Sequence, residues 1–112
     1  MTRKQDLEAL RDKVAAGDEP TATNVMDAFK IVGGIGFYAL EVLPAYNGSL
    51  NAAKALHDAV LPGWGWETSH LLKAQVYHMK CYSPIFGAQS TSPARAWLLA
   101  ILTALIEMEK AQ

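Results

Sequence analysis

Residues 92–106 read SPARAWLLAILTALI, and this stretch decides the fold class of the chain. Ser92 is a favoured N-cap residue, and Pro93 suits the first helical position, where its missing N–H costs nothing. From Ala96 to Ile106 the only polar residue is Thr103. A helix that is apolar on nearly all sides has to be covered on more than one side, so the sequence predicts a buried C-terminal helix.

Shorter amphipathic helices are predicted ahead of this segment. A capping box of Thr2 and Gln5 precedes a first helix that Gly17 ends, and Thr23 or Asn24 can cap a second. Residues 35–46 show no clean period, so we expect them to be irregular or partly helical. Ser49 caps a third helix that Pro62-Gly63 closes. The core positions expected on the first and third helices are Leu7, Leu10, Val14, Leu50, Ala53, Leu56 and Val60, with Lys54, His57 and Asp58 off that stripe.

Between these helices and the last one, two short strands are predicted, at residues 66–72 and 74–82. In the second strand the more apolar set is Tyr77, Met79 and Cys81, which we expect to face inward. Residues 83–92 contain proline, glycine and small polar residues, which are typical of a loop. The predicted fold is therefore α+β: a short antiparallel hairpin sheet packed with about four helices, the C-terminal one buried.

Size and charge limit what the chain can be. Its 112 residues predict a single domain, residues 1–112, with one core. Ten Lys and Arg stand against 11 Asp and Glu, and the basic residues are scattered, which disfavours nucleic-acid binding. Cys81 is the only cysteine, so no intrachain disulfide forms. With no signal peptide and no apolar run of the ~20 residues that span a bilayer, we expect a cytoplasmic protein without membrane insertion.

Three segments resemble small phage and prophage proteins, in particular the phage ABA sandwich domain family. They are PAYNGSLNAAKALH at 44–57, VLPGWGW at 60–66 and SPARAWLLA at 92–100. The resemblance covers roughly residues 44–106 and implies helix-sheet-helix layering in a viral or prophage setting, in the cytoplasm of a host cell. It carries over no catalytic residue. Residues 21–43 depart from the pattern and are a possible family-specific insertion.

The chemical candidates each have a plainer alternative that we favour. GIGFYA at 34–39 matches a dinucleotide-binding pattern, but no strand precedes it, so we favour a glycine hinge and expect no cofactor. Metal ligands or a thiol nucleophile could come from His70, His78 and Cys81, together with His57. Since residues three apart on a strand face opposite ways, we favour surface histidines, a buried thiol and no metal. Glu41 is either a buried carboxylate or, as we favour, one at the surface.

Two predictions concern binding. Trp64, Trp66 and Tyr82 could line an aromatic ligand pocket, although aromatic residues beside a hairpin and Trp97 in a buried helix more often fill the core. Ile35, Phe37, Tyr38 and Leu40 add more apolar surface than a small core requires, which favours self-association. We therefore expect a non-enzymatic, phage-derived binding or accessory protein. It would act through protein contacts, possible partners being a host, phage or defence component, and form a homodimer through residues 35–43 or the hairpin edge. The alternatives are a small-ligand-binding domain and, third, a small hydrolase.

Overall fold

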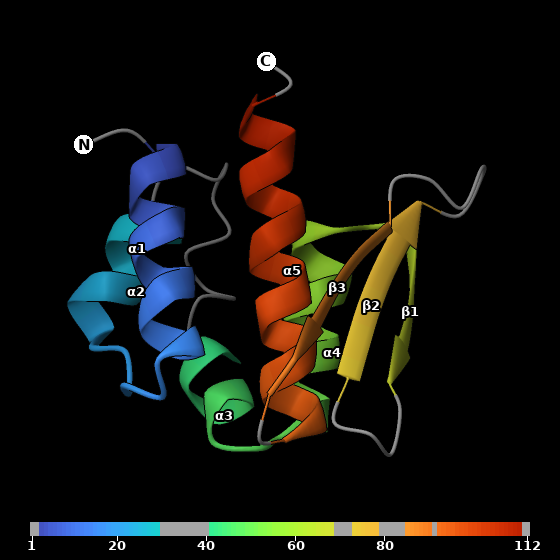
Figure 1. Cartoon of the computed structure of the whole chain (residues 1–112), viewed down its shortest axis with the longest axis horizontal. Helices are drawn as coiled ribbons and strands as arrows, with labels where there is room; N and C mark the ends of the chain where they lie inside the picture. The colour runs from blue at the N-terminus through green and yellow to red at the C-terminus, as the bar shows by residue number, and fades with distance from the viewer. Residues whose placement is uncertain (1–2, 30–40, 69–72, 79–84, 91, 111–112) are drawn as a thin grey trace.

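The structure is a computed structural model that describes residues 3–29, 41–68, 73–78, 85–90 and 92–110. In this part of the chain five helices and three strands follow one another (Figure 1). The helices are α1 (Arg3–Ala15), α2 (Ala22–Phe29), the short α3 (Val42–Tyr46), α4 (Leu50–Val60) and α5 (Pro93–Lys110). The strands are β1 (Trp64–Thr68), β2 (Lys73–His78) and β3 (Ile85–Gln89). The predicted α+β class is confirmed.

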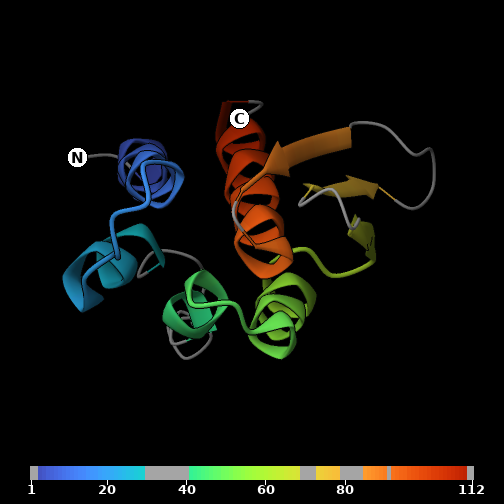
Figure 2. The ribbon, with the colours of Figure 1, turned by 60° about the horizontal axis from the view of Figure 1, so that its bottom comes forward.

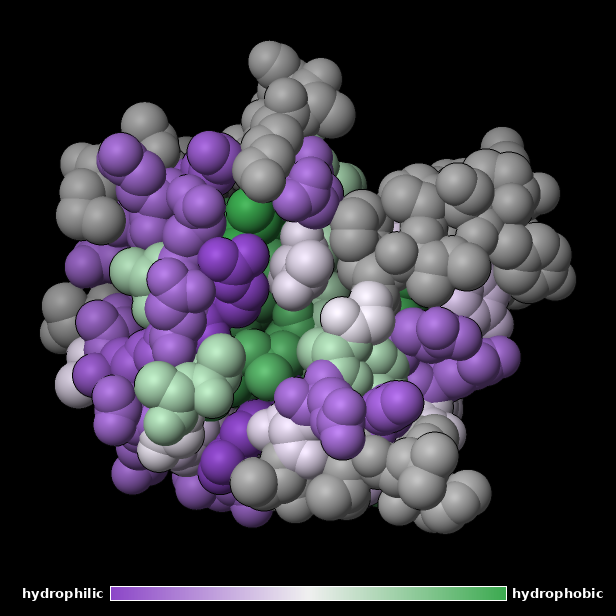
Figure 3. Space-filling view, viewed as in Figure 1, coloured by the Kyte–Doolittle hydropathy of each residue, from purple (hydrophilic) through white to green (hydrophobic). Residues whose placement is uncertain are grey.

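Helix α5 lies between the sheet and the other helices. It packs against β2 and β3 on one side and against α1 on the other, while α3 and α4 contact its N-terminal half (Figures 1 and 2). The predicted burial of this helix is confirmed, because Ala96, Leu98, Ile101, Leu102 and Ile106 are all buried. In Figure 3 the apolar surface forms a narrow band along α5, flanked by hydrophilic residues over α1.

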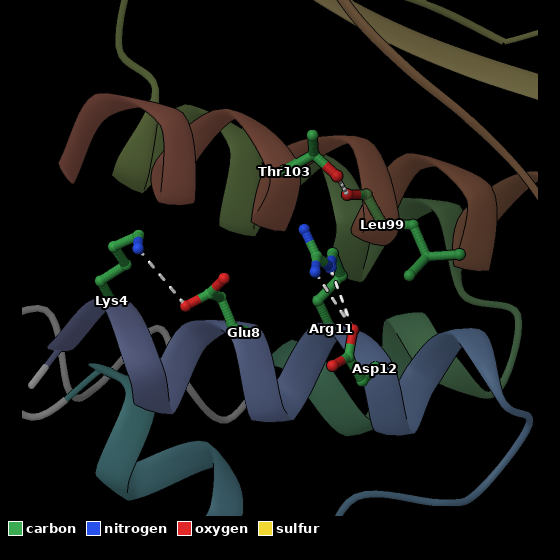
Figure 4. A network of polar contacts seen from close by, with 6 residues as sticks. All are labelled: Lys4, Glu8, Arg11, Asp12, Leu99 and Thr103. Carbon is green, nitrogen blue, oxygen red and sulfur yellow. Dashed lines mark hydrogen bonds and ion pairs between the residues drawn. The ribbon is translucent and has the colours of Figure 1, made fainter. Parts of the chain in front are cut away.

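Capping chemistry fixes where α4 and α5 begin. The Ser49 hydroxyl accepts a hydrogen bond from the Ala52 N–H at 3.1 Å, and the Ser92 hydroxyl accepts one from the Arg95 N–H at 3.1 Å. Each bond satisfies one of the N–H groups that a helix start leaves without a partner. Both predicted N-caps are therefore confirmed. Within α5, Thr103 donates its hydroxyl to the Leu99 carbonyl at 2.8 Å, so its polar group needs no outside partner (Figure 4).

Two details of the predicted helices are wrong. Helix α2 is capped by Thr21, not by Thr23 or Asn24: the Thr21 hydroxyl accepts from the Asn24 N–H at 3.1 Å, and the Asn24 side chain accepts from the Thr21 N–H at 3.0 Å. In α4 the expected core residue Leu50 is 47% exposed. His57 takes its place in the buried stripe. The stripe predicted on α1 is confirmed, since Leu7, Leu10 and Val14 are buried.

Charges on α1 pair locally. Lys4 and Glu8 approach to 3.8 Å one turn apart, and Arg11 bonds its neighbour Asp12 at 3.2 Å (Figure 4). Such exposed pairs contribute little to stability. The end of α1 is held by a longer-range contact, in which the Tyr46 hydroxyl donates to the Gly17 carbonyl at 2.7 Å. Arg95 stacks its guanidinium 3.9 Å from the centre of the Tyr46 ring and donates its Nε–H to the Tyr46 carbonyl at 3.1 Å, which connects α3 to α5.

The sheet has three antiparallel strands in the order β1-β2-β3. The prediction of a loop at residues 83–92 is wrong for 85–89, which form β3. The predicted inward face of the second strand is also wrong: Ala74 and Val76 are buried under α5, while Tyr77, on the opposite face, is only half-buried. Met79 and Cys81 lie outside the described residues. The inward face of β2 is the one that carries Ala74 and Val76 because α5 covers it. The small side chains of these two residues let the helix lie close to the sheet.

Candidate functional site

A polar and aromatic cluster is buried where α4, β1 and α5 meet. Helix α4 turns His57 into the core alongside Ala53, Leu56 and Val60, and only 1% of His57 is exposed. Its Nε2 lies 2.9 Å from the Trp64 carbonyl oxygen, and the indole N–H of Trp97 is 3.2 Å from its Nδ1. Since an indole N–H can only donate, Nδ1 must accept and Nε2 must carry the proton. The prediction of a surface His57 is therefore wrong.

Burial lowers the pKa of His57 from its ordinary value of 6.5. The hydrogen bond to Trp64 and the nearby Asp58 carboxylate act in the opposite direction, and Lys54 adds to the lowering. A protonated His57 would have no lone pair for the Trp97 indole. The imidazole is therefore neutral at pH 7, and both of its nitrogens are engaged within the fold. It is held as a structural group, so it has no free nitrogen for a metal ion or a substrate in this arrangement.

The tryptophans of the predicted aromatic pocket are partly brought together. Trp66 stacks on Trp97 with ring centres 4.2 Å apart and planes 28° from parallel, and Trp66 remains 39% exposed. Trp64 is half-buried and packs against the core. Tyr82 lies outside the described residues. Trp97 is thus core, as we favoured, whereas Trp66 presents part of an indole to solvent at the edge of the sheet.

Most other predicted site residues lie outside the part of the chain that the structure describes. This holds for Ile35, Phe37, Tyr38 and Leu40, for residues 34–39, and for His70 and Cys81. His78 belongs to β2, and Glu41, directly before α3, is half-buried. Among the described residues, no group of three or more His, Cys, Asp or Glu side chains is placed to hold a metal ion.

A feature that the sequence interpretation missed is a hollow in the outer face of the sheet, the face turned away from α5. Its volume is about 500 Å³. From this face it is lined by Glu67, Lys73, Gln75, Gly87 and Gln89, and Thr68, Ala74 and Ala88, which alternate with them along the strands, complete the lining. Gly87 stands opposite Gln75, so no side chain from β3 fills the space beside that amide. The alternation of glycine and glutamine at 87 and 89 was the available signal, but it fell in the segment interpreted as a loop.

The rim of this hollow carries both signs of charge. Gln75 donates its amide N–H to Glu67 at 2.8 Å, which orients the carboxylate across the strand pair. Lys73 follows the same face of β2 and is exposed, with Gln89 opposite it on β3. The described contacts give Lys73 and Gln89 no side-chain partner of their own. The hollow therefore offers an acceptor, a cation and two amides over a bare stretch of backbone.

The comparisons with known proteins give no relatives: no family model matches the chain, and neither curated proteins nor solved structures give a significant match. Across the described helices, none combines the length and the apolar character that crossing a membrane requires.

Proposed function

We propose that this chain is a small non-enzymatic binding protein of phage or prophage origin, which contacts a partner protein through the outer face of its sheet. The observation that carries the proposal is the hollow lined by Glu67, Lys73, Gln75 and Gln89, on a sheet face turned away from the core helix. Carboxylate, ammonium and amide groups side by side are suited to the polar groups of a protein surface.

The shape of this face supports a protein partner. Glycine stands beside the central strand on both sides, Gly65 opposite Tyr77 and Gly87 opposite Gln75. The outer face is therefore lower on the β1 side beside Tyr77 and on the β3 side beside Gln75. This surface shape lets a convex segment of a partner protein reach the sheet backbone at Gly87. A larger side chain at that position would keep the segment away.

The viral setting rests on the resemblance of residues 44–57, 60–66 and 92–100 to phage proteins. On this resemblance we propose that the protein acts in the cytoplasm of a host cell, with a host, phage or defence component as its partner. The near-neutral charge supports a protein partner over nucleic acid, because phosphate recognition needs clustered cations.

A photo-crosslinking experiment tests the proposal. A benzophenone amino acid replaces Gln89 at the hollow or, as a control, the exposed Asn51 on α4. We expect a discrete protein adduct from position 89 alone. Gly87→Thr adds a side chain to the hollow, and its Cβ would make ordinary contacts with its nearest atoms at 3.6 and 3.8 Å. This change and Lys73→Glu should each abolish the adduct, whereas Asn51→Thr should leave it. If the adduct forms equally well in Gly87→Thr and in Lys73→Glu, the proposal is contradicted.

A second candidate is binding of a small planar ligand on the exposed part of Trp66, as the predicted pocket of Trp64, Trp66 and Tyr82 proposed. Trp97 holds this indole in place at 4.2 Å, so a ligand that stacks on it would lose little of its binding energy to ordering the ring. A thermal-shift screen with nucleotides and metal ions tests it, since a ligand bound by the folded state raises the melting temperature. If the rise in melting temperature persists in Trp66→Leu, the ligand binds elsewhere on the protein. A small hydrolase is the third prediction, and no residue is assigned to it.

A further inference from the structure

Strand pairing fixes how the residues of the hollow lie relative to one another. On the outer face, Glu67, Gln75 and Gly87 stand side by side across β1, β2 and β3, and Lys73 and Gln89 form the next row along β2 and β3. Neighbouring strands of a sheet lie about 4.8 Å apart. Glu67 is therefore two strands away from Gly87, whereas Lys73 is a diagonal neighbour of Gly87 on the adjacent strand.

Two features keep the space over Gly87 open. Gly87 has no side chain and is exposed, so the surface that it presents is backbone. Gln75, which pairs with it on β2, donates its amide N–H to Glu67 at 2.8 Å. This bond directs the Gln75 side chain toward β1 and away from β3. A ligand can therefore reach the sheet backbone on the β3 side of Gln75.

Of the two charged residues in the lining, Lys73 is the nearer to this space and the less engaged. Glu67 already accepts a hydrogen bond from Gln75, whereas the contacts of the described residues include no ion pair for the exposed Lys73. The flexible stem of a lysine lets its ammonium group move over a neighbouring position. Gln89, opposite Lys73 on β3, is also exposed and carries amide N–H donors. The β3 side of the hollow is therefore suited to an anion.

We propose that the hollow binds the carboxylate of an aspartate or glutamate side chain on a segment of the partner protein. The Lys73 ammonium and the Gln89 amide donate to this carboxylate, and the aliphatic part of the acidic residue lies on the Gly87 backbone. Hydrogen bonds between charged groups are stronger than neutral ones, so this contact contributes both affinity and orientation. The assignment rests on the proposed function and adds the chemistry of the group that the face recognises.

The Glu67 carboxylate determines on which side of Gln75 the ligand lies. Like charges repel, so an acidic side chain is disfavoured on the β1 side, where Gln75 holds Glu67, and favoured beside Lys73. Removing the charge of Glu67 should therefore strengthen binding of an acidic ligand, and removing the charge of Lys73 should weaken it. A basic ligand would show the opposite pair of effects.

Peptides from a random phage-displayed library test the assignment. The library is selected on the wild-type protein, and peptides that also bind Gly87→Thr are removed. We expect the retained peptides to share an acidic residue at a fixed position. Fluorescence polarisation with the synthetic peptides measures the dissociation constant. Replacing the shared acidic residue by its amide counterpart should raise this constant roughly tenfold, because a charge-assisted contact is lost.

Two variants of the protein give the sign of the charge effect. Lys73→Met should raise the dissociation constant of the same peptides roughly tenfold. Glu67→Gln, whose amide oxygen can still accept from Gln75, should lower it. Lys54→Met on α4 is the matched control for the loss of an exposed lysine and should leave the constant unchanged. Circular dichroism of each variant verifies the fold.

Three results overturn the acidic ligand: a selection that retains no peptide, retained peptides without a shared acidic residue, and an affinity that Lys73→Met does not lower. The photo-crosslinked adduct at position 89 decides the proposed function separately. If that adduct is lost in Gly87→Thr while the retained peptides share a basic or apolar residue, the face binds a partner and the acidic ligand is wrong. If the adduct and the peptides are both absent, both proposals are wrong.

Discussion

Replacing His57 by leucine should destabilise the fold by about 1 to 3 kcal/mol at pH 7.5. A leucine side chain is apolar and of similar size to histidine, so packing is largely kept. The expected loss of stability therefore comes from the hydrogen bonds that His57 makes. The Trp97 N–H, 3.2 Å from His57 Nδ1, would remain buried without an acceptor, and a group left in that condition costs about 1 to 3 kcal/mol. The Trp64 carbonyl, which accepts from His57 at 2.9 Å, would lose its partner as well. Urea unfolding followed by tryptophan fluorescence measures the change.

The same variant should alter how stability depends on pH. The folded-state pKa of His57 is lowered, so below pH 6.5 the unfolded chain takes up a proton that the folded chain does not. The contribution of His57 is therefore full above pH 6.5. It is lost as the pH falls from there toward the folded pKa, with a slope of at most about 1.4 kcal/mol per pH unit. The difference in unfolding free energy between wild type and His57→Leu should shrink on acidification from pH 8 to 5.5.

Two results would refute this reasoning. One is a His57→Leu protein that is as stable as wild type at pH 7.5. The other is a free-energy difference that stays constant from pH 8 to 5.5, which would mean that His57 takes up its proton equally in both states. His57→Gln is the matched control, because its amide can still accept from an indole but does not titrate. It should recover part of the stability without the dependence on pH.

Three further predictions follow from single contacts. Leu102→Ala removes a side chain buried at the centre of α5 and should cost about 2 to 5 kcal/mol in urea unfolding, and a loss below 1 kcal/mol would contradict the core position. Arg95→Lys loses the planar stack on Tyr46 and the Nε–H bond to its carbonyl, so it should cost about 1 to 2 kcal/mol, while Arg95→Met as a control should cost at least as much. Cys81 lies outside the described residues and stays a prediction: its thiol should resist a thiol reagent in the native state and react after denaturation, and rapid native labelling would contradict this.

The parts of the fold that could be predicted are those fixed by local chemistry. Ser49 and Ser92 cap helices through bonds to residues three positions away, and the glycines at 17 and 63 end helices with positive φ values of 81° and 82°. The apolar run of α5 predicted its own burial without any knowledge of its neighbours. Each of these signals is contained within one turn or one helix, so the sequence alone carries it.

The parts that could not be predicted depend on partners distant in the sequence. A histidine in an otherwise apolar stripe is acceptable in a core only when its nitrogens are satisfied, and the indole that does so belongs to Trp97, 40 positions later. The orientation of β2 was ambiguous because Ala74 and Val76 compete with the larger Tyr77, and only the position of α5 decides between them. Strand β3 was missed because Gly87 weakens a strand in isolation, whereas pairing with β2 compensates for it.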